Sequence, residues 1–298
     1  RKQPSIPMDD DDEMENILSV GAPKTTPTLS IEMGILPNPW IFFRALVGSG
    51  LAFGIFYVSI IIFQNGKLIP GLLMIGAFAI PFSVLILFFE LNTPRNISLF
   101  RVVQFVIVGG SASLLFSLFL FDLTDLSSLF GASAAGIVEE AGKLAAVLAA
   151  MKLVPADRYN FRLNALLFGA AVGTGFSAFE TAGYALETPG EMLNLITLRG
   201  LYSPLTHIVW TAIAAAAYWH ARQKTSDAWS TIASGPFLRL FAVPVALHFT
   251  WNLDISTPFD VHRLIIGFIG WVVVLSLVQT GLREVAATAE AQASTPTL

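Results

Sequence analysis

Two adjacent glutamates and a lysine lie in the middle of a long apolar run, in the segment Gly136-Ile-Val-Glu-Glu-Ala-Gly-Lys143. Glu139 and Glu140 precede Lys143 by four and three residues, so a helix would place all three side chains on one face. An ionisable side chain at the centre of a bilayer costs at least about 2.5 to 3.5 kcal/mol, so it persists where it is paired, hydrated or functional. A structural ion-pair cluster would need only one carboxylate for one lysine. The second carboxylate is therefore a candidate base for activating water.

The next apolar run ends in a second polar stripe, Phe176-Ser-Ala-Phe179-Glu180-Thr-Ala-Gly-Tyr184. Phe176, Glu180 and Tyr184 follow one another at intervals of four residues and would share a helix face. A tyrosine near the end of a membrane span is ordinarily an interfacial anchor. Glu180 lies deeper in its span and is a candidate site residue.

Two histidines complete the set of candidate groups. His207 stands in Leu205-Thr-His-Ile-Val-Trp210, near the start of an apolar run. His248 and Asn252 are one helical turn apart, and Pro244 precedes His248 by one turn. A proline inside a helix removes a backbone hydrogen bond, so the sequence predicts a kink that gives water room beside His248.

The composition indicates that these groups lie in a membrane protein. Hydrophobic residues make up 54% of the 298 positions and charged residues 13%, against about 25% charged in soluble domains. The chain has no cysteine, which excludes disulfides, thiolate metal sites and a cysteine nucleophile. It also has no phosphate-binding loop, no serine nucleophile motif and no basic patch for nucleic acid.

The sequence predicts an all-α, polytopic transmembrane helical bundle, because apolar runs of about 20 residues recur along it. We expect one membrane domain at 38–284, an acidic, disordered N-terminal tail at 1–37 and a short polar tail at 285–298. About eight spans are expected, at 40–63, 69–91, 102–121, 128–151, 163–186, 201–221, 237–253 and 264–281.

Lys and Arg placement predicts the orientation. With these spans, thirteen of the 17 basic residues fall on one side, one (Lys143) lies inside a span, and only Lys67, Arg199 and Arg263 fall on the other side. Cytoplasmic loops retain positive charge, so both termini are expected to be cytoplasmic. At about 1.5 Å per residue, Glu139 lies near the midplane, and Glu180, His207 and His248 lie roughly 8 to 9 Å below the outer boundary. The polar groups should therefore meet in one layer, open to the extracytoplasmic side.

Three motifs resemble those of the PrsW family of intramembrane proteases, relatives of the CAAX prenyl endopeptidases (the CPBP group). They are Glu-Glu-x-x-Lys at 139–143, Phe-Glu-x-x-x-Tyr at 179–184 and His-x-x-x-Asn at 248–252. The resemblance covers roughly residues 132–252. It implies an integral protein of a bacterial or archaeal cell membrane that cuts a single-span membrane protein, such as an anti-sigma factor, near the outer surface.

The resemblance also implies residue roles. Glu139 or Glu140 would activate water, Lys143 would hold the partner carboxylate, and His248 with Asn252 would polarise the scissile carbonyl. Which glutamate is the base stays open at this stage. The prenyl-protease relatives have Phe-x-x-x-His in the second motif, where this chain has Glu180 four residues after Phe176. His207 could take the place of that histidine. The residues expected to support the site or the substrate are Phe176, Phe179, Tyr184 and Trp210.

Two cofactor states fit the residues. His207, His248 and Glu180 could supply a zinc site of two histidines and one glutamate, with one position left for water. Hydrolysis by a glutamate without metal is the alternative. It is slightly preferred, because no His-Glu-x-x-His motif is present and the resemblance to the prenyl-protease relatives implies glutamate chemistry without a metal.

Two other functional classes remain possible at this stage. A proton-coupled transporter or channel also uses buried Glu, Lys and His. A non-catalytic scaffold for membrane proteins would need only the small-residue helix faces, such as Gly169 and Gly173.

Overall fold

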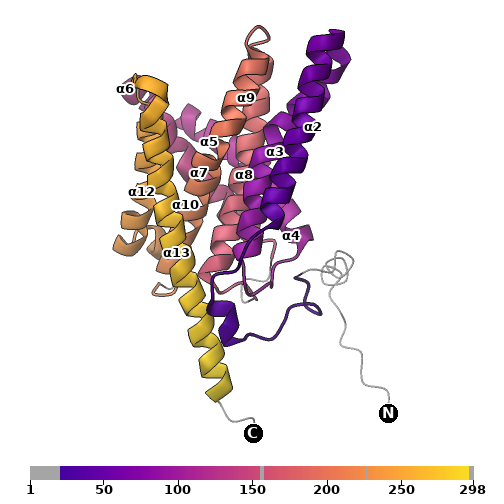
Figure 1. Ribbon diagram of the computed structural model, residues 1–298. Helices are drawn as coiled ribbons and strands as arrows, with labels where there is room; N and C mark the ends of the chain where they lie inside the picture. Colours follow the sequence, from indigo (N-terminus) through magenta and orange to yellow (C-terminus); the bar gives the residue numbers. More distant parts are fainter. Residues whose placement is uncertain (1–20, 155–157, 226, 295–298) are drawn as a thin grey trace.

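The computed structural model describes residues 21–154, 158–225 and 227–294, and every regular element within them is a helix (Figure 1). The predicted all-α class is therefore confirmed. Eight long helical segments follow the eight predicted runs closely. They are α2 (Ile41–Phe63), α3 (Ile69–Leu91), the continuous α4 (Leu99–Gln104), η3 (Phe105–Gly109) and α5 (Gly110–Leu123), α7 (Ala135–Met151), α8 (Arg162–Glu187), α10 (His207–Arg222), α12 (Gly235–Trp251) and α13 (Val261–Ser294).

Shorter elements connect these segments. They are η1 (Ile31–Gly34), η2 (Gly66–Leu68), α6 (Leu126–Phe130), η4 (Gly131–Ala134), α9 (Met192–Tyr202), η6 (Ser203–Leu205), α11 (Ala228–Ile232) and η7 (Pro258–Asp260).

Five helical segments in the described part of the chain are long and apolar enough to cross a membrane. They contain α2, α3, α4 to α5, α8 and α13. The other three helices, α7, α10 and α12, have 17, 16 and 17 residues. At 1.5 Å per residue each is about 25 Å long, close to the thickness of a hydrocarbon core. The apolar helices support an integral membrane protein, and the eight-span arrangement stays a prediction.

The outer helices of the bundle expose apolar side chains, and the central helices are buried. α2 has no buried residue and packs mainly against α3. The Glu90 carboxylate at the end of α3 caps α2, because it accepts hydrogen bonds from the amides of Trp40 and Ile41 at 2.9 Å and of Phe42 at 3.0 Å. α8 and α10 lie in the centre and make the most extensive helix pair of the fold.

Small residues set the distance between α8 and α10. A Cβ atom at Gly169 would lie 2.4 Å from the carbonyl oxygen of Thr211, and one at Gly173 would lie 2.6 Å from that of His207. Only glycine permits this approach without movement of the backbone. The packing brings the first residue of α10 directly against the middle of α8, where the polar stripe of α8 begins.

The structure differs from the expected elements at three places. The predicted fourth span starts at 128, whereas α6 and η4 occupy 126–134 and α7 starts at Ala135. The predicted sixth span starts at 201, whereas the chain forms a separate helix α9, breaks at η6 around Pro204 and starts α10 at His207. α13 continues well past 281 to Ser294 and extends beyond the bundle (Figure 1). Its last part is rich in Ala and Glu, which favour helix, and η1 packs on it, with Gly34 against Ala286. Residues 1–20 and 295–298 of the predicted tails lie outside the described residues, and the domain boundaries stay predictions.

Candidate active site

Four helices bring the six predicted ionisable residues together. α7 carries Glu139, Glu140 and Lys143 on consecutive turns of one face. α8 carries Glu180, α10 begins with His207, and His248 lies in the last turn of α12. Five of the six are buried, and the Glu180 side chain is 15% exposed. The helices therefore bring together in one cluster the groups that the sequence analysis had placed in one layer of the membrane.

Lys143 and Glu140 form the centre of the cluster. The Lys143 Nζ atom lies 2.6 Å from Glu140 Oε1, and both side chains are fully buried. The same carboxylate oxygen lies 2.8 Å from His248 Nδ1. A carboxylate accepts hydrogen bonds, so Nδ1 of His248 carries a proton and Nε2 points away from Glu140. The rings of Trp210 and His248 stack at 4.4 Å, and Lys143 Nζ lies 4.5 Å from the centre of the Phe176 ring.

The partners of His207 define its tautomer. Its Nδ1 atom lies 2.9 Å from Lys143 Nζ, and its Nε2 atom lies 3.0 Å from Glu180 Oε2. An ammonium group only donates, so Nδ1 accepts; a carboxylate that accepts requires the proton on Nε2. Both ring nitrogens of His207 are therefore occupied by protein partners.

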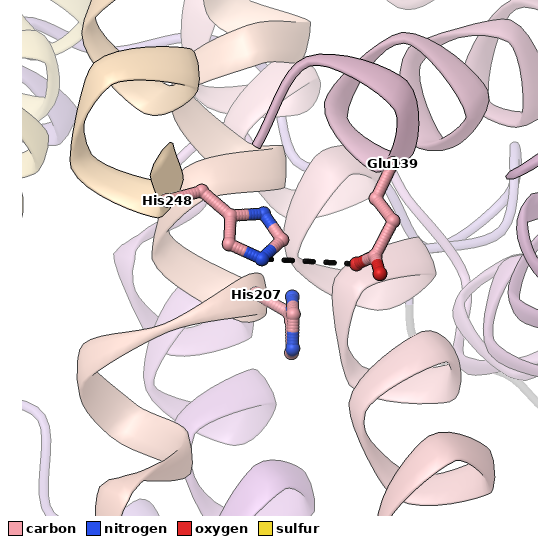
Figure 2. Close-up of side chains that lie close together, drawn as sticks. All are labelled: Glu139, His207 and His248. Carbon is pink, nitrogen blue, oxygen red and sulfur yellow. Dashed lines mark ion pairs between the residues drawn. The ribbon is translucent and has the colours of Figure 1, made fainter. Parts of the chain in front are cut away.

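Glu139 differs from Glu140 in its contacts. Its Oε2 atom lies 3.8 Å from both Lys143 Nζ and His248 Nε2 and has no hydrogen-bond partner among the described residues, as is also true of Oε2 of Glu140. Oε1 of Glu140, in contrast, has two close partners. Figure 2 shows the Glu139, His207 and His248 side chains converging. Glu139 also lines a cavity of about 450 Å³ together with Glu180, His207 and His248, and Glu140 does not. Of the two glutamates, Glu139 is the one that can meet water and substrate.

Of the remaining predicted residues, Phe176, Tyr184 and Asn252 line this cavity, and Phe179 and Trp210 do not. Asn252 lines it and donates a hydrogen bond from Nδ2 to the carbonyl oxygen of Ala132 at 3.3 Å. Tyr184 also lines it, whereas Phe179 packs against Phe78 of α3 at 5.7 Å between ring centres. Pro244 lies inside α12, one turn before His248 as predicted.

Arg199 is a site residue that the sequence analysis did not single out. It lies on α9, and its Nη2 atom is 2.5 Å from Glu180 Oε2. The signal was a lone arginine in the loop between the predicted fifth and sixth spans, 19 residues after Glu180, but its meaning depends on a helix that the apolar pattern did not predict.

A family comparison decides the class of protein. A family model described as PrsW family intramembrane metalloprotease matches residues 68–278. The chain belongs to this family. The matched range contains all six ionisable residues of the cluster and confirms the family predicted from the three motifs. It favours the protease interpretation over the transporter and scaffold alternatives. No curated protein and no solved structure matches the chain.

The name of the PrsW family implies a metal, and the residue types of the cluster partly fit one. Glu139, His207 and His248 each offer a ligand atom within 4.8 Å of the others. In this group Glu139 takes the place of Glu180, and the predicted ligand set of His207, His248 and Glu180 stays a prediction. His248 has the arrangement of a zinc ligand, with Nδ1 held by a carboxylate and Nε2 directed at the cluster.

The hydrogen bonds of this PrsW-family site oppose a bound dication. A zinc ligand must offer a free lone pair, yet Nδ1 of His207 already accepts from Lys143 and Nε2 donates to Glu180. The Lys143 ammonium also lies 3.8 Å from Glu139, so it would repel a metal bound to that carboxylate. In this arrangement the donor set does not fit zinc.

Proposed function

We propose that the chain is an intramembrane endopeptidase in which Glu139 activates water to hydrolyse a peptide bond of a membrane-anchored protein. The observation that carries this proposal is the Glu139 carboxylate, which is buried, lines the cavity and has an oxygen without a hydrogen-bond partner among the described residues. The 3.8 Å between Glu139 Oε2 and His248 Nε2 is too long for a direct hydrogen bond, so both atoms can bond instead to a water in the cavity that they line.

The reaction follows from these positions. Glu139 removes a proton from water, and the water oxygen attacks the carbonyl carbon of the scissile bond. The developing oxyanion accepts a hydrogen bond from the second N–H of the Asn252 amide, and Nε2 of His248 accepts a hydrogen bond from the attacking water while Nδ1 is held by Glu140. Glu139 then returns the proton to the nitrogen as the C–N bond breaks, which leaves a carboxylic acid and an amine. Glu140 holds His248 and Lys143 in place throughout.

We expect this hydrolysis to proceed without zinc. Purified, active protein should contain far less than one zinc per chain and should keep its rate of cleavage in excess chelator. Elemental analysis alongside the cleavage assay measures both quantities. Stoichiometric zinc, with activity lost on chelation and restored by zinc, would show instead that His207 and Lys143 rearrange to admit the metal.

The proposed substrate is a single-span membrane protein, such as an anti-sigma factor, cut near the extracytoplasmic surface. Two features support cleavage on the extracytoplasmic side. The distribution of Lys and Arg predicts that both termini are cytoplasmic. A second cavity of about 690 Å³ lies on the side of α9 and η7, and it shares Arg199, His207, Trp251 and Asn252 with the cavity of Glu139. In the predicted topology this second cavity is the extracytoplasmic approach to the site.

Cysteine labelling tests the orientation, because the chain has no native cysteine. Thr188 and Lys152 are exposed and lie at opposite ends of the bundle. Thr188 directly follows α8, and Lys152 directly follows α7. An impermeant maleimide applied to intact cells should label Thr188→Cys, and it should label Lys152→Cys only after the membrane is opened. The reverse pattern would place the site on the cytoplasmic side.

A further inference from the structure

Arg199 links the short helix α9 to the catalytic cluster. Its Nη2 atom pairs with Glu180 at 2.5 Å, and its Nε atom donates to the Thr181 hydroxyl at 3.3 Å. Its guanidinium carbon lies 4.3 Å from the centre of the Tyr184 ring. Three separate contacts therefore fix one side chain of α9 on two turns of α8.

The contacts continue from Arg199 into the site. The Glu180 oxygen that pairs with Arg199 is the same atom that lies 3.0 Å from Nε2 of His207. The other ring nitrogen of His207 lies 2.9 Å from Lys143, which in turn pairs with Glu140. Among the described residues, Arg199 is the only Lys or Arg besides Lys143 in ion-pair contact with the carboxylates of this cluster.

We propose that Arg199 is a positioning residue for the proteolysis proposed above: through Glu180 it holds His207 in the tautomer whose Nδ1 accepts from Lys143. This inference rests on the proposed function. The hydrogen bonds and ion pair of Arg199 go to Glu180 and Thr181 and not to Glu139 or His248, so its direct contacts reach the site through Glu180 and His207.

The physical reason is charge balance in a buried place. Glu180 can accept the Nε2 proton of His207 as a carboxylate only while a cation compensates its charge, and Arg199 is the adjacent cation. Without Arg199, Glu180 would turn to water in the cavity or would take up a proton itself. His207 would then be free to rotate, and Lys143 would lose one of its two hydrogen-bond partners.

A double-mutant cycle with cleavage kinetics tests the proposal. Arg199→Gln should lower kcat by roughly 10- to 100-fold, as loss of an orienting partner typically does, with KM changed little. Arg199→Lys should recover part of the lost kcat, because it keeps the charge. Arg199→Gln combined with Glu180→Gln should have the kcat of Glu180→Gln alone, since Arg199 acts through that carboxylate.

Arg239→Gln is the matched control. Arg239 is exposed near the start of α12 and donates from Nε to the carbonyl oxygen of Gly235 at 3.2 Å, and it lines neither of the two cavities. Its removal should change kcat by less than about threefold.

The inference is overturned if Arg199→Gln keeps the parent kcat, or if the two losses multiply in the double variant. Loss of thermal stability with unchanged kcat would likewise show that Arg199 only holds α9. A parent rate in Glu139→Gln is a separate result, which would overturn the proposed function itself.

Discussion

Replacing Glu139 with glutamine is expected to lower kcat by roughly 10²- to 10⁴-fold, the usual contribution of a general base. The amide keeps the shape of the side chain and removes the group that takes the proton from water. Its Oε2 atom accepts no hydrogen bond in the described structure, so helical content and thermal stability in detergent should stay close to those of the parent. Cleavage of a reconstituted substrate, with circular dichroism on the same preparation, measures both properties.

Glu140→Gln is the comparison for this variant, and it should behave differently. Glu140 accepts from Lys143 at 2.6 Å and from His248 at 2.8 Å, so its replacement disturbs two buried partners. We expect loss of cleavage together with loss of stability. Turnover near the parent rate in both variants would exclude a glutamate base in the Glu139–Glu140 pair.

Lys143→Met is expected to destabilise the protein by about 3 to 5 kcal/mol and to abolish cleavage, because it leaves an uncompensated carboxylate in the centre of the bundle. Both Lys143 and Glu140 are fully buried, so solvent cannot replace the lost partner. The variant also removes the donor to Nδ1 of His207. Thermal unfolding in detergent, read beside activity, measures the two effects.

Lys152→Met provides the matched control on the same helix. Lys152 is exposed at the end of α7 and has no part in the cluster, so its stability and kcat should equal those of the parent. If Lys143→Met were as stable and as active as Lys152→Met, the ion pair with Glu140 would have no role in holding the site.

The sequence was sufficient to predict the main helices and the composition of the cluster. Apolar runs long enough to span a bilayer match the long helices, since lipid leaves the backbone few alternatives to a helix. The prediction that Glu139, Glu180, His207 and His248 lie close together came from their depths in the predicted spans. Both inferences depend on distance along a helix, which the sequence defines.

Three features depended on information that a single sequence lacks. The choice between Glu139 and Glu140 follows from the rotation of α7, which turns Glu140 toward Lys143 and His248 and Glu139 toward the cavity. The rotation of α7 also explains why Glu139, and not the expected Glu180, is grouped with the two histidines. α9 was missed because an 11-residue helix after Pro189-Gly190 is too short to form a span, and its role comes from the contact of Arg199 with Glu180.

The most direct test of the account is mass spectrometry of the products formed when the purified protein and a single-span substrate are reconstituted in proteoliposomes with chelator present. We expect the parent to cut the substrate at one peptide bond, near its extracytoplasmic boundary, and Glu139→Gln to form the same fragments at least about 100-fold more slowly. Fragments formed by Glu139→Gln at the parent rate, or no cleavage by the parent until zinc is restored, would contradict activation of water by Glu139 without metal.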